Sequence, residues 1–484
     1  MNPFKHIKPL LTILFCCIFG MAQAQFVKEI IKNNRYQIGA GAFLSASENL
    51  PFWLHANQYG EVPLKSQFLQ FSGSVHHEYD SLYTKAGKLN KFGWGYAARA
   101  VANVGKVNQF ILSEGYLKAR FSAFEFYAGR RKEIFGLVDT TLTSGSYIWS
   151  GNALPMPKIQ ISIPNFTPIT KNGLISLKGG FAHGWFGNTP SVQKFFLHQK
   201  WLYGKLKLKK INLIAGFNHQ VQWGGTNNGK NSTNFYSFLY SVAPLKFVSP
   251  KASSSLTIGD LQNRVGNQLG TIDFAAEFDI HDTNWLIYRQ NLYEQGAALL
   301  RLANISDGLN GLTLRKQLKA GIIRFNLEFL YTQNQGTSPL LFTKEVGWEL
   351  ENYFTHYAYR DGWSYLNKII GTPLILTEEI SEIEFNNGTQ FVASNRVKAW
   401  KFSMGYHKLN SFHLNINYLW MNQKGILLQR MATSDNFNQN SISLDLSKKL
   451  KKGLMLNYSL NYDFGQILTD SNLGTFIGLV KNLK

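Results

Sequence analysis

The sequence predicts an all-β protein, a transmembrane antiparallel β-barrel of about 18 strands. Apolar and polar residues alternate with a period of two along much of the chain, which is typical of strands with two different faces. Charged residues make up 16% of the chain and aromatic residues 14%, whereas an ordinary soluble domain has roughly 25% charged residues. After the first residues, no continuous apolar run reaches the length of about 20 residues that a membrane-spanning helix needs.

The segment Thr271 to Glu294 shows the alternation most clearly. In its first half the apolar residues Ile272, Phe274, Ala276, Phe278 and Ile280 share one face, and the acids Asp273, Glu277 and Asp279 share the other. A polar turn, His281 to Asn284, leads into a second run, Trp285 to Tyr293. In a soluble sandwich the apolar face would meet a core. In a membrane barrel it meets lipid while the acids line a wet lumen, and this is the alternative that we predict.

The chain begins with a predicted signal peptide, residues 1–24. Lys5 and Lys8 give it a positive start, Leu10 to Met21 form an apolar core, and Ala22-Gln23-Ala24 forms a cleavage site with small residues. Both cysteines of the chain, Cys16 and Cys17, lie in this segment, so the mature protein contains none. We therefore expect an exported protein that is not built on disulfides.

The remaining segments follow in order. Gln25 to Asn33 could form a short helix on the periplasmic side. Residues 135–173, 224–270 and 334–395 are long irregular segments, which belong on the extracellular side of a barrel.

The prolines are expected between strands, because proline cannot donate to a sheet ladder. No break in composition marks a second domain, so residues 25–484 form a single barrel. The alternating runs that we predict as strands include 36–45, 67–79, 92–104, 108–121, 175–184, 195–208, 211–223, 297–304, 309–316, 321–332, 412–420, 442–447, 454–464 and 475–483.

The net charge of +21 is strongly basic. In an exported protein this charge indicates acidic partners, such as lipopolysaccharide phosphates or an acidic polysaccharide, rather than nucleic acid. The alternative is that the lysines only rim the barrel.

Several blocks of the sequence stand out, and they follow one another in a fixed order along most of the chain. They are PFWLHANQYG (51–60), GFNHQVQWGG (216–225), GDLQNRVGNQLGTIDF (259–274), YRQNLYEQGA (288–297), DGLNG (307–311) and DGWSYLNKIIGTPL (361–374). These blocks resemble the capsule-assembly Wzi family of outer-membrane proteins. The resemblance implies an 18-stranded barrel that is partly closed by periplasmic helices. It also implies a lectin-like, non-enzymatic role in holding capsular polysaccharide at the cell surface.

Other motifs give weaker signals. The run GGTNNGKNS (224–232) is close to a phosphate-binding loop, but Asn231 replaces the Ser or Thr that would hold magnesium. His76 and His77 are adjacent and would point to opposite faces of a strand, and no HxxxH or CxxC spacing occurs, so we expect no metal. No GxSxG motif is present, and we expect neither an enzyme nor a cofactor.

Two sets of residues are candidates for function. Charged residues that we place in the lumen as a polar network are Arg131, Asp273, Glu277, Asp279, Arg289 and Glu328. A purely structural ladder of ion pairs is the alternative for this set. Residues that we place in loops as polysaccharide contacts are Trp223, Arg264, Asn267, Trp363, Tyr365 and Lys368. Aromatic rings suit the flat faces of sugars, and Arg and Lys suit uronate or phosphate groups. The alternative for the aromatic residues is a girdle at the membrane interface.

The function predicted from these observations is an outer-membrane barrel, expected to be a monomer in contact with outer-membrane lipid, that binds capsular or other acidic surface polysaccharide. The first alternative is a pore or transporter for small solutes, which conductance across a planar bilayer would distinguish. The second is an outer-membrane lipid hydrolase, which would release fatty acid from labelled lipid.

Overall fold

The computed structural model describes residues 34–79, 91–227, 229–230, 233, 235–242, 265–294, 298, 302–337, 350–383, 391–408, 411–427, 436–468 and 471–483. The predicted signal peptide, the predicted helix Gln25 to Asn33 and the predicted contact residue Arg264 lie outside the described residues. No helix among the described residues is long and apolar enough to cross a membrane.

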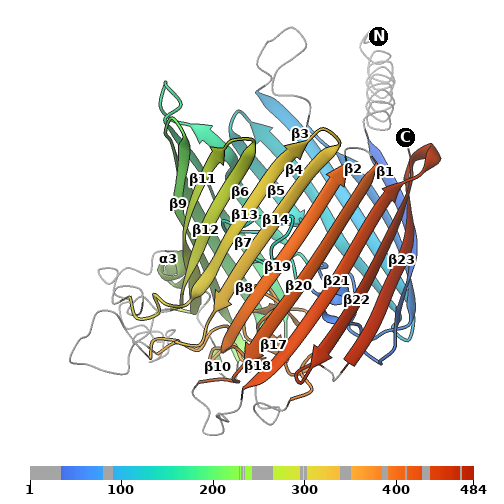
Figure 1. The fold of residues 1–484 in the computed structure, drawn as a ribbon. Helices are drawn as coiled ribbons and strands as arrows, with labels where there is room; N and C mark the ends of the chain where they lie inside the picture. Colours follow the sequence, from blue (N-terminus) through green and yellow to red (C-terminus); the bar gives the residue numbers. More distant parts are fainter. Residues whose placement is uncertain are drawn as a thin grey trace, which may run out of the picture.

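Eighteen antiparallel strands form a closed barrel (Figure 1). Each strand pairs with the next along the chain, β9 pairs with β11 and β14 with β19, and the pairing of β1 with β23 closes the ring. The short strand β10 (Gly229–Lys230) pairs with β9 alone among the described strands. The wall consists of β1 (Arg35–Ser45), β2 (Phe68–His77), β3 (Phe92–Gly105), β4 (Gln109–Phe121), β5 (Phe124–Arg130), β6 (Lys158–Pro168), β7 (Ile175–Asn188), β8 (Gln193–Lys207), β9 (Ile211–Asn227), β11 (Asn267–Ile280), β12 (Thr283–Tyr293), β13 (Gly308–Leu318), β14 (Gly321–Tyr331), β19 (Val397–Lys408), β20 (Phe412–Gln423), β21 (Phe437–Lys449), β22 (Leu454–Gly465) and β23 (Ser471–Leu483).

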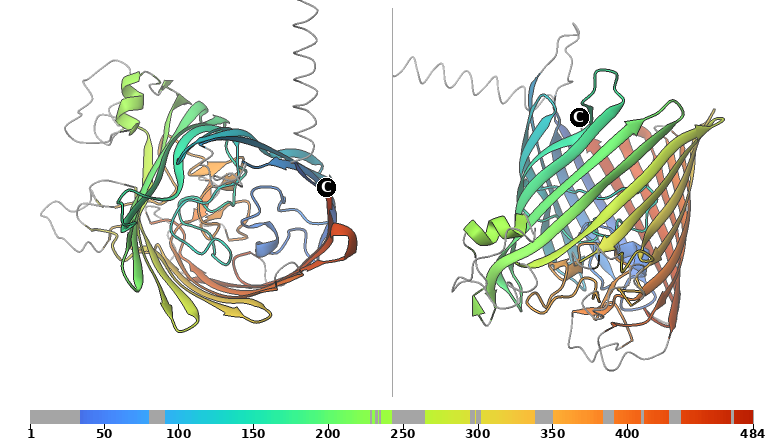
Figure 2. Two further views of the ribbon diagram at one scale, coloured as in Figure 1. Left: turned by 90° about the horizontal axis from the view of Figure 1, so that it is seen from above. Right: turned by 90° about the vertical axis from the view of Figure 1, so that its left-hand side faces the viewer.

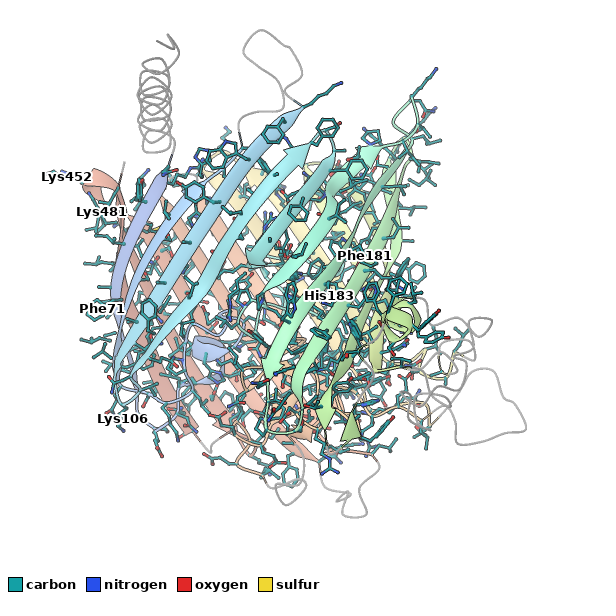
Figure 3. All side chains as sticks on the ribbon, turned by 180° about the vertical axis from the view of Figure 1, so that it is seen from behind. Phe71, Lys106, Phe181, His183, Lys452 and Lys481 are labelled. Carbon is teal, nitrogen blue, oxygen red and sulfur yellow. The ribbon has the colours of Figure 1, made fainter. Side chains whose placement is uncertain are left out.

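The two ends of the barrel differ in their connections. At one end, which we call the turn end, β1 begins and β23 ends, and short turns such as 122–123, 281–282 and 319–320 join the strands. The longest connections, 46–67, 131–157, 228–266 and 332–396, leave from the opposite end, which we call the loop end. Lys452, in the 3-10 helix η2 (Lys451–Gly453), and Lys481 lie at the turn end, whereas Lys106 lies at the loop end (Figure 3).

The two faces of the wall have opposite polarity. On β11, Phe274 points outward and is 52% exposed, whereas Asp273 points inward and is fully buried. Phe71 and Phe181 likewise lie on the outer face (Figure 3). The prediction of a transmembrane antiparallel barrel is confirmed, and the hairpin Thr271 to Glu294 corresponds to β11 and β12, joined at His281 and Asp282.

Some elements differ from the prediction. Residues 297–304 were expected to form a strand, but the described residues of this segment lie in a helical turn and in turns. Strand β6 lies inside the predicted irregular segment 135–173 and contains Pro164. The register between β6 and β7 shifts between Ile163 and Thr167, so this proline occupies a bulge, where the missing N–H costs no ladder bond.

Three segments from the loop end fold back into the lumen and form a plug (Figure 2). They are 46–67, with the short helix α2 (Phe52–His55), 131–157, and 350–383, with the hairpin β15 (Ser364–Tyr365) to β16 (Lys368–Ile369) and strand β17 (Leu376–Thr377), which pairs with β18 (Val392–Ser394). We expected the irregular segments 135–173 and 334–395 to be external loops, and for 135–157 and 350–383 this is wrong. Their apolar side chains share one buried core with wall residues such as Leu197 and Leu309, and burying them inside the barrel removes that surface from water.

Candidate functional site

The plug is centred on Trp363, which is fully buried. Its indole N–H donates to the carbonyl of Ile148 at 2.8 Å, so the side chain ties segment 350–383 to segment 131–157. The ring also packs edge-on against Trp149 and, on the wall, Phe186, with ring centroids 6.1 and 6.0 Å away. One side chain thus holds two plug segments and the barrel wall together.

Polar side chains on the inner wall bind the backbone of the plug. Asp273 accepts a hydrogen bond from the backbone N–H of Leu137 at 3.1 Å, and Glu328 accepts one from that of Ser144 at 2.5 Å. Buried backbone groups need such partners. The same arrangement joins Gln290 to the N–H of Tyr147, Asp463 to that of Phe52, Gln222 to the carbonyl of Gly362 and Gln423 to that of Leu374. The wall therefore fixes the position of all three plug segments.

Ion pairs add to this attachment. The ammonium of Lys158, at the start of β6, lies 2.8 Å from a carboxylate oxygen of Glu133 in the plug, and the Lys158 side chain is 1% exposed. The same ammonium lies over the rings of Phe135 and Trp149, at 4.5 and 4.8 Å from their centroids. Burial favours the neutral form of Glu133, but Lys158 and then Arg131 hold the pKa of this carboxyl below its ordinary value.

The predicted lumen network is only partly present. Arg131, which forms an ion pair with Glu125, lies inside the barrel with Asp273, Glu277 and Glu328, each bonded to different neighbours rather than to one another. Asp279 is exposed at the turn end and accepts from Asn284.

The placement of Arg289 in the lumen is wrong. Its neighbours Tyr288 and Gln290 point inward, so Arg289 lies on the outer face.

The predicted polysaccharide contacts lie in different places. Trp223 is not in a loop: it lies on the outer face of β9, 4% exposed, where it packs against Phe238 of helix α3 (Phe235–Val242) and near His183 (Figure 3). Asn267 is buried at the start of β11 and donates to Gln222.

Trp363, Tyr365 and Lys368 lie inside the plug, not at the membrane interface. The Tyr365 hydroxyl accepts from Arg130 at 3.0 Å, and the Lys368 ammonium donates to the carbonyl of Val62 at 2.8 Å. Burial lowers the pKa of Lys368 to about 8. Whether any of these side chains contacts a polysaccharide stays a prediction.

Sequence reasoning missed two exposed residues of the same segment. Tyr357 is 60% exposed beside His356, and Arg360 is also exposed. The neighbouring Tyr359 is buried, and its hydroxyl donates to the carbonyl of Gly224 at the loop end. Tyr357 and Tyr359 are two positions apart in the run HYAYR, so a period of two would place both on one face, and the sequence carries no signal that separates the exposed ring from the buried one. Among the described residues, no group of three or more His, Cys, Asp or Glu side chains could hold a metal ion.

From the surroundings of Asp307 we predict that the stability of the structure at the loop end depends on pH. It is fully buried and accepts from the backbone N–H of Gln335 and the hydroxyl of Tyr353, both at 2.7 Å. Burial outweighs these bonds and raises its pKa from 3.8 to about 6. A raised pKa means that the native state binds this proton more tightly than the unfolded state does. Its contribution to the free energy of unfolding is therefore largest below about pH 4 and is lost, to the extent of about 3 kcal/mol, as the pH rises through about 6.

We therefore expect a protease to cleave segment 350–383 more slowly at pH 5 than at pH 7.5. Asp307→Asn should reduce this difference, and what remains is expected from Glu294, whose pKa burial also raises and which accepts from the backbone N–H of Phe354. Asp282→Asn, at an exposed turn-end position, should preserve the full difference. Equal pH dependence in the wild type and Asp307→Asn would show that another group is responsible. Cleavage of a pH-independent reference protein corrects for the protease's own pH profile.

Comparison with known proteins agrees with this architecture. The Escherichia coli outer-membrane protein Wzi, a carbohydrate-binding β-barrel involved in group 1 capsule assembly, has a similar solved structure: TM-score 0.58, 14% identity, 94% of this chain and 86% of that chain covered. The Pseudomonas aeruginosa outer-membrane protein OprD gives a TM-score of 0.46 at 9% identity, with 93% and 94% covered. Pseudomonas aeruginosa OpdL gives 0.44 at 9% identity, with 93% and 99% covered. No curated protein sequence matches.

Residues 39–469 match the family described as Capsule assembly protein Wzi. The match spans most of the chain and nearly the whole barrel, from β1 into the last connection before β23. The chain therefore belongs to the Wzi capsule assembly family.

Proposed function

We propose that this protein is a lectin-like outer-membrane barrel that binds capsular or other acidic surface polysaccharide and helps to assemble or retain it at the cell surface. Membership of the Wzi family and the carbohydrate binding of the Escherichia coli relative support this proposal. We also propose that residues 1–24 direct export, that the loop end faces outward, and that the barrel is a monomer without catalytic activity.

The way in which the plug is attached to the wall is the observation that favours a binding protein over a pore. Displacing the plug to open a wide pore would break contacts with the wall, because side chains such as Asp273, Glu328 and Gln290 bind its backbone directly. Breaking these bonds would leave buried polar groups without partners, at a cost of about 1–3 kcal/mol each. We infer that the plug is a fixed platform and that the polymer binds on its outer side.

We propose Tyr357 and Arg360 as contacts on this platform. A tyrosine ring can stack on the flat C–H face of a sugar, and a guanidinium can bind a uronate with two parallel hydrogen bonds. Many weak contacts along one polymer would add through avidity. Arg264 remains a candidate from the sequence for the same role.

Substitution at these positions should weaken binding. We expect Arg360→Ala and Tyr357→Ala each to reduce the affinity for the host's own purified polysaccharide roughly tenfold, because a hydrogen bond to a charged group contributes about 1.5–3 kcal/mol. Surface plasmon resonance with immobilised polysaccharide measures this change. Tyr236→Ala is the matched control, since Tyr236 is exposed to a similar extent, 68% compared with 60% for Tyr357, and lies on α3 outside the barrel. Unchanged affinity in both variants would show that this part of the platform does not contact the polysaccharide.

Deleting the gene tests the function as a whole. A strain without the protein should release surface polysaccharide into the medium, and the wild-type gene should restore retention. Unaltered cell-bound polysaccharide in the deletion strain would contradict the proposal.

A further inference from the structure

The outer wall of the barrel carries a groove over strands β8 to β19. On this side, which the green and yellow strands form in Figure 2, register partners on neighbouring strands create rows that run across the sheet. One row consists of Leu213, Ala276, Ile287, Leu312 and Leu327, and is apolar throughout. The next row, closer to the loop end, consists of Ala215, Phe274, Arg289, Asn310, Phe329 and Trp400.

Small residues and inner packing explain why the wall is hollowed here. Residues of both rows line a space of about 1110 Å³. Ala215 and Ala276 leave room between larger neighbours such as Phe274, which is 52% exposed. On the inner side of the same strands, Ile214, Ala275 and Tyr288 form a cluster that packs against the plug residues Leu137 and Val138. The plug thus supports a stretch of wall whose outer surface is concave, apolar and directed at lipid.

Arg289 is the exception within this apolar surface. Its guanidinium is held by neutral oxygens toward the loop end: the side-chain oxygens of Asn310 (2.6 Å) and Asn291 (3.1 Å) and the carbonyls of Asp307 (3.2 Å) and Ile305. Among the described residues, no carboxylate lies within ion-pair distance of it, and the carboxylate of Asp307 is bonded elsewhere. The groove therefore ends beside a guanidinium that makes no ion pair among the described residues and that feels the buried carboxylate of Asp307 as a nearby opposite charge.

A cation on the lipid face is unfavourable at the bilayer midplane and becomes tolerable close to the interface. Arg289 lies one residue past the middle of β12, and its long side chain reaches toward the loop end, where it meets the carbonyls of Ile305 and Asp307. The rings of Phe329 and Trp400 are in contact at a tilt of 33°, with centroids 4.4 Å apart, and border the same end of the groove; Trp is typical of membrane interfaces. From Arg289 toward the turn end, the outer side of the groove is apolar, which suits an acyl chain and not a sugar polymer.

We propose that this groove binds one anionic membrane lipid, with an acyl chain across the apolar row and its phosphate at Arg289. The chemistry of the ligand follows from the site: hydrocarbon for the groove and a negative charge for the guanidinium, which can bind phosphate with two hydrogen bonds. This site lies on the outside of the wall and is separate from the polysaccharide platform of the proposed function. The lipid would cover the concave wall on the side opposite the plug.

Native mass spectrometry of the full-length mature protein tests the proposal. The protein is equilibrated in mixed micelles with equal amounts of phosphatidylglycerol and phosphatidylcholine, and the retained lipid is identified by mass. We expect the wild type to retain phosphatidylglycerol in roughly fivefold preference, the factor that corresponds to one basic side chain near an anionic surface. Arg289→Gln should reduce this ratio to about one, because only the charge is lost. Ala276→Phe, which fills the groove, should reduce retention of both lipids.

The controls are matched by position. Lys106→Gln removes an exposed cation at the loop end of another part of the wall, and Ala40→Phe adds the same ring to the exposed outer face of β1. Both should behave as the wild type does. Equal retention of the two lipids by the wild type, an unchanged ratio in Arg289→Gln, or displacement of the lipid by inorganic phosphate alone would each overturn the proposal. If Ala276→Phe fails to fold, the ratio in Arg289→Gln decides.

Discussion

Replacing Trp363 with alanine is expected to convert a silent barrel into a conducting one. The substitution removes a fully buried indole and its hydrogen bond to Ile148 from the centre of the plug. Such a loss in a core costs about 3–5 kcal/mol. The strand ladders of the wall do not involve this side chain, so the barrel should remain closed while the plug loosens. Conductance steps in planar bilayers should appear with the variant and be absent or rare with the wild type.

Leu366→Ala is the control for this experiment. Leu366 lies in the same hairpin, between β15 and β16, but is 58% exposed, so its loss should leave the membrane silent. Heat-dependent migration on gels confirms that each variant still contains a folded barrel. Steady open channels in the wild type would contradict a fixed plug and favour the pore. Trp363→Ala with no conductance and unchanged resistance to proteolysis would show that the plug does not depend on this residue.

The second large effect is expected at the ion pair of Lys158 and Glu133. Either Lys158→Met or Glu133→Leu alone leaves the other group buried without its charge partner, at a cost of about 3–5 kcal/mol. The double variant Lys158→Met/Glu133→Leu removes both groups and should recover most of that loss, since a buried pair replaced by apolar side chains is often neutral. The rate at which a protease cleaves segment 131–157 measures the stability of the plug.

A double-mutant cycle makes this prediction specific. We expect a coupling energy of more than about 1 kcal/mol between the two positions, because they are in direct contact. The exposed pair Lys65 and Glu48, 3.1 Å apart, serves as the comparison and should show little coupling. Additive effects at Lys158 and Glu133 would mean that packing, and not charge, holds this part of the plug.

The strands could be predicted where lipid and lumen impose opposite polarity on their two faces. The acids and aromatic residues of β11 alternate without interruption, and its register, turn and inward face were all predictable. Strand β6 was not, because Pro164 and a bulge break its period. Strand β19 has Lys398 on one face and Lys401 on the other, so its alternation is hidden. In β12 the polar residues Arg289 and Gln290 are adjacent, and the sequence alone does not indicate which of them faces lipid.

The candidate site was less predictable than the fold. A run rich in Trp and Tyr has the same composition in a membrane girdle, a sugar platform and a buried plug. Only the tertiary arrangement places Trp363 against Ile148, whose sequence position is far away, and Tyr357 at the surface. The presence of a long irregular segment was readable from the sequence, whereas the direction in which it folds was not.

The pairing of β1 with β23 has a consequence for biogenesis. Their rungs, from Tyr36 with Leu483 to Ser45 with Gly474, join the first strand of the barrel to its last strand. Until β23 is in place, β1 keeps one ladder of N–H and C=O groups unsatisfied and open to wrong partners. Chains that stop before residue 471 lack β23, so the pairing that closes the barrel cannot form. Such chains should therefore be substrates for periplasmic chaperones and proteases.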